Sequence, residues 1–370
     1  MTSQTVPGWV PSDRETSPSQ PAVGPTPRPG ESGREATGTP AELVEPSRGQ
    51  RLRTGAFALL FAPVALVLMG LAVTDLQVQS SVGQPLSSSE GLVGLLVATL
   101  LLTLIAMNSD QSSAGMVVTT VASLVVGTLQ ILGVSGGPLS RIVSASGADV
   151  RAAMVWSLYP LGVSAICLGV TLANVGQRRR VKDAVSRVRA GAPGGPGIGA
   201  TPGSGADTDL EDAFGRSPRH LRARTMVILA SLLLVLAASL ALVWAAPDNT
   251  LEVARLGLPG ILVGVTLDPL AGVVSAACLG IVAWSNRWSS LGPVLASWVL
   301  MIVPAYFVLP VWASLTGHVA TPGASPLTAL SLSAPVVTAL GLVLTSMSLG
   351  VYWTRRHLDR QVHPEASGTI

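Results

Sequence analysis

Long apolar stretches alternate with polar segments along this 370-residue chain, and the apolar stretches dominate its pattern. A helix of roughly 20 apolar residues spans the bilayer core, because the helix pairs all of its own backbone polar groups. The apolar segment 258–264 is either the start of the sixth run or a separate re-entrant segment. The pattern predicts an all-α integral membrane protein with about eight transmembrane helices, at 55–74, 88–107, 115–134, 152–174, 225–246, 266–285, 291–313 and 334–353.

Polar segments divide these runs into two groups of four. The N-terminal segment and the segment between the groups are rich in Pro, Gly, Ser and Thr, a composition that buries too little apolar surface to fold. We therefore expect a disordered cytosolic N-terminus and a flexible linker. The predicted organisation is a tail at 1–50, a first membrane unit at 51–180, a basic Gly/Pro-rich linker at 181–224, a second membrane unit at 225–356 and a tail at 357–370.

The basic residues indicate an orientation. Most Arg residues precede the first run, lie between the fourth and fifth, or follow the eighth, whereas only Arg141, Arg151 and Arg255 fall on the opposite side. Cytoplasmic loops of membrane proteins carry an excess of Lys and Arg. The sequence therefore predicts a multi-pass plasma-membrane protein with both termini in the cytosol.

A short phrase occurs twice, as SSAG at 112–115 and SSLG at 289–292. At a constant offset of 177, Ser112 matches Ser289 and Gly115 matches Gly292. In the predicted order of spans, each of the two phrases forms the turn between the second and third helix of its group. We expect the two groups to be parallel repeats, which an axis along the membrane normal would relate.

Composition supports the membrane assignment. Hydrophobic residues make up 48% of the chain and charged residues only 12%, about half the usual fraction of soluble domains. Arg greatly outnumbers Lys, and Ala, Gly and Pro are abundant, which favours a GC-rich bacterial origin. Cys167 and Cys278 both lie in apolar runs, so we expect packing residues and not a disulfide.

Candidate chemistry is sparse, because no predicted span carries an ionisable residue near its middle. Glu90 and Asp268 open the second and sixth spans, where a carboxylate can cap free helix N–H groups. The alternative is that they form an outward-facing polar site, with Arg151 as a nearby cation. Arg151 is otherwise an ordinary loop residue or the partner of an acid at a span end.

The basic run after the fourth span has two interpretations. It contains Arg178, Arg179, Arg180, Arg187 and Arg189 around apolar residues at helical spacing. Such a segment either fixes orientation as a solvated flank or lies along the inner leaflet and contacts anionic lipid.

The sequence predicts no catalytic, cofactor-binding or metal-binding residue and no nucleic-acid partner. Its histidines are scattered, and no Gly-rich phosphate loop or nucleophile–base pair is recognisable. We therefore expect a non-catalytic envelope or membrane-assembly module, which would have membrane-protein partners or form homo-oligomers. The alternative is a permease or lipid-handling transporter that uses a cleft between two parallel repeats. A membrane enzyme is the third hypothesis, but the sequence shows no recognisable set of catalytic residues to support it.

Overall fold

The computed structural model describes residues 48–81, 88–110, 112–131, 158–191, 220–245, 269–309, 311, 315 and 326–362, and those residues form helices and short turns without a strand. Residues 1–47 of the predicted tail lie outside these ranges, as do residues 192–219 of the predicted linker. Along the described chain the helices are α2 (Arg48–Ser81), α3 (Ser89–Met107), η1 (Asn108–Asp110), α4 (Ala114–Ile131), α7 (Tyr159–Gly191), α9 (His220–Trp244), α11 (Pro269–Ser285), α12 (Leu291–Ser297), η2 (Trp298–Val308) and α14 (Pro326–Val362).

The chain is a helical membrane protein. Six stretches are long and apolar enough to cross a bilayer, namely Arg48–Gln77, Ser89–Met107, Tyr159–Arg180, Arg224–Trp244, Leu291–Val308 and Leu330–His357. The predicted third and sixth spans correspond to the shorter apolar helices Ala114–Thr128 and Leu270–Ser285.

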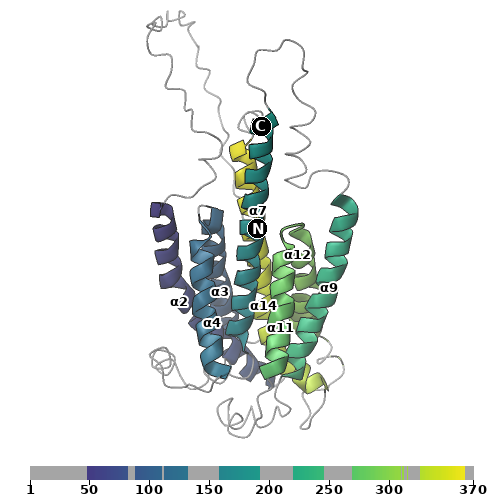
Figure 1. Cartoon of the computed structure of the whole chain (residues 1–370). Coiled ribbons are helices and arrows are strands. Elements are labelled where there is room, and N and C mark those ends of the chain that lie inside the picture. Colours follow the sequence, from purple (N-terminus) through teal and green to yellow (C-terminus); the bar gives the residue numbers. More distant parts are fainter. Residues whose placement is uncertain are drawn as a thin grey trace, which may run out of the picture. The chain divides into compact units, whose positions relative to one another are not determined.

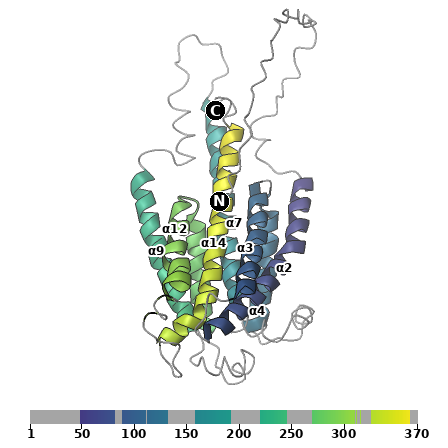
Figure 2. The ribbon, with the colours of Figure 1, turned by 180° about the vertical axis from the view of Figure 1, so that it is seen from behind.

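The helices form two groups on either side of α7 and α14, as Figures 1 and 2 both show. In one group, α2 packs against α3 and α4, and α4 packs against α7. In the other, α9 packs against α11 and α12, while α12 and η2 pack against α14. The order of contacts is therefore the same in both groups.

The two groups are joined by crossed packing. Helix α3 packs against α14, the last helix of the other group, and α11 packs against α7 in the same way. Helices α7 and α14 also contact each other. Helices α7 and α14, the last helices of the two groups, therefore each pack against their own group and against the second helix of the other group.

Small residues allow the closest of these crossed contacts. A Cβ atom added to Gly169 of α7 would lie 2.3 Å from the Gly280 carbonyl oxygen and 2.8 Å from the Ala283 Cβ, both on α11. A Cβ atom added to Gly350 of α14 would lie 2.7 Å from the Ala106 Cβ on α3. Glycine is needed at these positions because only its absent side chain lets the backbones approach so closely.

The repeated phrase occupies equivalent contacts in the two groups. A Cβ atom added to Gly115 would lie 3.0 Å from the Thr54 carbonyl oxygen on α2. One added to Gly292 would lie 3.2 Å from the Ser231 Oγ on α9. Thr54 and Ser231 are separated by the same offset of 177 as the two glycines. Each phrase therefore starts the third helix of its group at a close contact with the first.

The predicted seventh span changes its helix type. Residues Leu291–Ser297 are α-helical, but Trp298–Val308 form a π-helix that contains Pro304. The Leu309 N–H donates to the Pro304 carbonyl, five residues earlier. Proline lacks an N–H and disrupts the α-helical ladder, so Pro304 accounts for a distortion in this span.

Helices α7 and α14 are longer than a membrane requires. Their 33 and 37 residues give lengths of about 50 and 55 Å, against roughly 30 Å for the hydrocarbon core. Their C-terminal parts extend side by side beyond the neighbouring helices (Figures 1 and 2). The boundaries predicted after residues 180 and 356 fall inside these helices, because charged residues end an apolar run without ending a helix.

Candidate functional site

Buried polar residues gather where α3 and α11 end and where α7 and α14 leave the bundle, and we call this the basic end of the bundle. Six of them are at most 7% exposed, and the two arginines are partly buried. Burial of so many polar groups is tolerated only where they form hydrogen bonds. The set, which we call the polar junction, consists of Ser109, Asn174, Gln177, Arg178, Asn286, Ser348, Thr354 and Arg355.

In the first group, the polar junction closes the end of α3. The Arg178 Nη2 donates to the Ser109 carbonyl at 2.7 Å. The Asn174 Nδ2 donates to the Ser109 Oγ at 3.3 Å. The last carbonyls of a helix lack intrahelical donors and lie at the negative end of its dipole. Arg178 satisfies a carbonyl of η1, directly after α3, and complements the dipole of α3.

In the second group, the equivalent arginine does the same for α11. The Arg355 Nη2 donates to the Asn286 carbonyl. The Asn286 Nδ2 donates to the Ala283 carbonyl at 2.9 Å and to the Ser348 Oγ at 3.1 Å. Arg178 and Arg355 are 177 residues apart, as are Ser109 and Asn286. The same arginine-to-carbonyl bond therefore occurs at the same offset in both groups.

Two further bonds of the polar junction cross between the groups. The Arg355 Nε donates to the Gln177 Oε1 at 2.7 Å, which links α14 to α7. The Ser109 and Thr354 hydroxyls lie 3.3 Å apart, which links α3 to α14. The junction thus fastens α14 both to α7 and to the end of α3 at the basic end.

Arg287 lies beside the polar junction in the turn after α11. Its guanidinium carbon is 3.7 Å from the ring centroid of Trp284 and 3.6 Å from that of Trp288. The two rings are 5.3 Å apart, edge to face. Burial, and next the positive charge of Arg180, lower the pKa of Arg287 below its ordinary value. Two aromatic faces hold this cation in place through cation–π attraction.

The residues predicted for an outward-facing site are only partly described. Glu90 is exposed in the first turn of α3, at the end opposite the polar junction. Ser88 is the N-cap of that helix: its Oγ accepts from the Gly91 N–H at 2.9 Å and donates to the Asp75 carboxylate of α2. Asp268 and Arg151 lie outside the described residues, so a site that contains all three stays a prediction.

The basic run predicted to contact lipid does not behave as one set. Arg178 takes part in the polar junction, whereas Arg179 and Arg180 are exposed. Arg187 and Arg189 lie on the continuous helix α7, and their side chains are outside the described residues.

The sequence does not single out the polar junction, because charged groups at the middle of spans are the usual signal of a membrane site. Most members of the junction are instead amides and hydroxyls near span ends, such as Asn174 and Asn286. The offset of 177 was a usable signal, since it places Gln177 opposite Thr354 and Arg178 opposite Arg355.

The polar junction can position neighbouring helices and donate hydrogen bonds. Its side chains are guanidinium, amide and hydroxyl groups, and none of its eight members is a carboxylate or thiol nucleophile. Across the described residues no three His, Cys, Asp or Glu side chains lie together as a metal site would require. Comparison with known protein families, characterised proteins and solved structures finds none that matches this chain.

Proposed function

We propose that this chain is a non-catalytic scaffold of the bacterial plasma membrane, built from two parallel four-helix units that are locked together. The observation that carries the proposal is the crossed packing of α3 on α14 and of α11 on α7, fastened by the polar junction. A rigid core with long projecting helices suits a protein that positions partners. In this proposal α7 and α14 present their extended ends to other proteins in the cytosol.

Separation of the two units would be unfavourable. It would break the Arg355–Gln177 bond and leave a buried arginine or amide without its partner, at about 1–3 kcal/mol for each unsatisfied group. It would also open the glycine-mediated contacts at Gly169 and Gly350. A cleft that opened between the units would have to break all of these contacts at once.

Internal duplication supports the two-unit architecture with eight spans. The offset of 177 relates Gly115 to Gly292 and Arg178 to Arg355, and each pair makes corresponding contacts. The order of helix contacts is also the same in both groups. The shorter helices α4 and α11 would then be the third and sixth spans of the eight.

The cytosolic placement of both termini rests on the excess of arginine at the basic end. Reporter fusions after residues 50, 200 and 365 are expected to give a cytosolic signal, because basic loops are retained on that side. An external signal from any one of the three would overturn the orientation. A fusion after residue 145, between the third and fourth predicted spans, is the matched external control.

A permease remains the second candidate, and the π-helix η2 favours it. π-Helical turns are rare and occur often at functional sites, and broken helices line the substrate sites of many transporters. Helix η2 contacts both α9 and α14 within the second unit. A permease would have to move the two units relative to each other.

A cross-unit disulfide separates the two candidates. Ser109→Cys and Thr354→Cys would be introduced together in a Cys167→Ala, Cys278→Ala background, because the two native hydroxyls are 3.3 Å apart. A scaffold is expected to oxidise completely in native membranes and to keep its protein partners, identified by photo-cross-linking from the projecting ends of α7 and α14 and mass spectrometry. Ser109→Cys with Arg356→Cys is the control pair, since Arg356 is exposed.

Partial oxidation whose extent changes with an added solute would contradict the scaffold and favour the permease. Purification of the protein with a stoichiometric bound solute, and without any cross-linked protein partner, would also favour the permease over the scaffold.

A further inference from the structure

We propose that the basic end carries a binding site for a phosphate group, formed by the guanidinium groups of Arg180, Arg224 and Arg287, and that the headgroup of an anionic phospholipid supplies this phosphate. This site shares only Arg180 with the flat lipid contact predicted for the basic run. It does not depend on the scaffold proposal, since a permease could bind the same lipid.

Arg355 brings Arg180 and Arg287 together. It bonds to Gln177 on α7 and to the Asn286 carbonyl in the turn after α11. Arg180 lies three residues after Gln177, hence on the same face of α7, and Arg287 directly follows Asn286. One partly buried arginine, Arg355, thus fixes the spacing between two cations that reach the surface.

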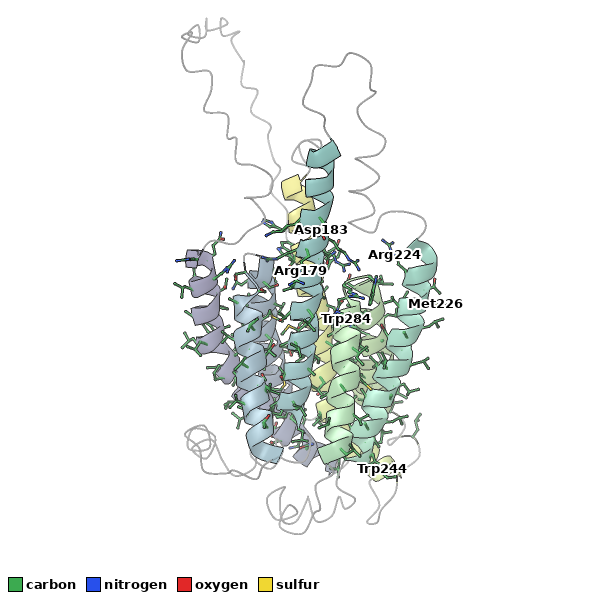
Figure 3. All side chains as sticks on the ribbon, viewed as in Figure 1. Arg179, Asp183, Arg224, Met226, Trp244 and Trp284 are labelled. Atoms are coloured by element: carbon green, nitrogen blue, oxygen red, sulfur yellow. The ribbon has the colours of Figure 1, made fainter. Side chains whose placement is uncertain are left out.

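Helix α9 contributes the third cation. The Ser231 Oγ of α9 lies 3.4 Å from the Ser285 Oγ at the end of α11. Arg224 is two helical turns nearer the basic end on the same face of α9, a rise of roughly 10 Å. Figure 3 shows Arg224 at the start of α9, at the same end of the bundle as Arg179 and Asp183, with Trp244 at the opposite end. Arg224 is exposed and accessible to a ligand.

The electrostatics of this group call for an anion. Arg180 is close enough to repel both Arg287 and Arg355, and Arg224 also repels Arg355. The exposed Asp183 lies one turn after Arg180 on α7 and already interacts with its surroundings, and Asp359 lies one turn after Arg355 on α14. An anion bound among the guanidinium groups would relieve the repulsion between them. Guanidinium groups match the geometry of phosphate oxygens and bind them as charge-assisted donors.

The guanidinium group of Arg287 is held in position without a bound ligand. Trp284 and Trp288 both contact its guanidinium, so little side-chain freedom is lost on binding. Its Nε is buried, and no acceptor for it exists among the residues that the structure describes. Asn286 Oδ1, one residue earlier, is likewise without a donor in that part of the chain.

The tryptophans favour a lipid as the source of the phosphate. Trp side chains concentrate at the level of the headgroups, and basic pockets between transmembrane helices bind anionic headgroups. The Trp284–Trp288 pair therefore places the cations at the depth where a phospholipid phosphate lies.

The test measures lipid binding by the full-length protein. Native mass spectrometry would compare retention of phosphatidylglycerol with retention of phosphatidylcholine after reconstitution in a mixture of the two. The variants are Arg287→Gln, Arg287→Lys and the exposed Arg180→Gln, which has no packing role and guards against a folding defect. Arg51→Gln, at an exposed position near the start of α2, is the matched control.

The wild type and Arg51→Gln are expected to retain phosphatidylglycerol preferentially. Arg287→Gln and Arg180→Gln should each weaken this retention about fivefold, in line with roughly 1 kcal/mol per basic residue near the surface. Retention of phosphatidylglycerol by Arg287→Lys should lie between that of the wild type and that of Arg287→Gln, because lysine keeps the positive charge but lacks the forked donors of the guanidinium group. Equal retention by all variants, or equal loss in Arg51→Gln, would overturn the site.

A second arm distinguishes the two sources of phosphate. Inorganic phosphate at millimolar concentration is expected to leave lipid retention unchanged. If inorganic phosphate protects the wild type from thermal unfolding, with no preference between the two lipids, the lipid assignment is overturned and free phosphate is the ligand.

Discussion

Gly169 and Gly176 both lie on α7, two turns apart, but only Gly169 meets another backbone. A Cβ atom at Gly176 would contact nothing within 4 Å, whereas one at Gly169 would lie 2.3 Å from the Gly280 carbonyl oxygen. Gly169→Ala is therefore expected to lower the free energy of unfolding by about 1–3 kcal/mol through overpacking. Thermal unfolding in detergent would measure this. Gly176→Ala is the control and should leave the midpoint unchanged or slightly higher, because alanine favours helix.

Arg355 and Arg356 form a second matched pair at the residue scale. Arg355 donates to Gln177 and to the Asn286 carbonyl, whereas Arg356 is exposed. We expect Arg355→Gln to lower stability by about 1.5–3 kcal/mol, the usual range for hydrogen bonds to charged groups. Arg356→Gln should change it by less than about 0.5 kcal/mol, as most surface substitutions do. Equal unfolding midpoints for the two variants would show that the Arg355 bonds contribute no stability.

At this scale the sequence predicts position better than role. The arginines at 178–180 and 355–356 were placed at span ends from charge alone, and they do lie there. Their roles differ because Arg178 and Arg355 face the ends of neighbouring helices, whereas Arg179 and Arg356 face outward. This difference depends on how helices from distant parts of the chain pack together, and the composition of the chain does not reveal that packing.

At the element scale, the apolar runs predicted the location of the helices more reliably than their ends. Helix α7 continues to Gly191 and α14 to Val362, well past the last apolar residue of each run. Hydropathy measures affinity for lipid, whereas a helix ends where its backbone hydrogen bonds end. The π-helical form of η2 was also not predictable, since Pro304 indicates a distortion without specifying its type.

The continuous helix α7 leads to a measurement of depth. Of its 33 residues, about 20 span the hydrocarbon core, which leaves the last turns roughly 15–20 Å beyond it. A fluorophore on Ala190→Cys in a background without the native cysteines should escape quenching by nitroxide-labelled headgroups. One on Gly176→Cys should be quenched strongly. Strong quenching at residue 190 would instead favour the segment lying along the inner leaflet.

At the scale of the whole molecule, the sequence indicated two units and their likeness but gave no sign of the crossed packing. The three identities in the repeated phrase indicate equivalent turns, but they do not indicate which helix of one unit contacts which helix of the other. The contacts of α3 with α14 and of α11 with α7 arise from small residues such as Gly169 and Gly350. Many other glycines occur in the apolar runs, so these two could not be singled out beforehand.

Crossed packing predicts that the chain can be divided at its linker. Fragments 46–191 and 216–370, expressed together, should purify as one complex, because each supplies a surface that the other needs. An affinity tag on one fragment would recover both in equal amounts. Gly169→Leu in the first fragment should reduce recovery, since its side chain would overlap the α11 backbone. Independent behaviour of the two fragments would contradict the crossed contacts.

The crossed contacts also set a waiting time during synthesis. Helix α7 is complete at Gly191, but its partner α11 ends only at Ser285, and the partner of α3 is completed later still. At ordinary translation speeds, the newly inserted α7 waits roughly 5–20 s with its small-residue face against lipid. Slow codons between residues 192 and 268 would lengthen this interval and expose the nascent protein to membrane proteases. Faster decoding of the same stretch should therefore raise the yield of intact protein.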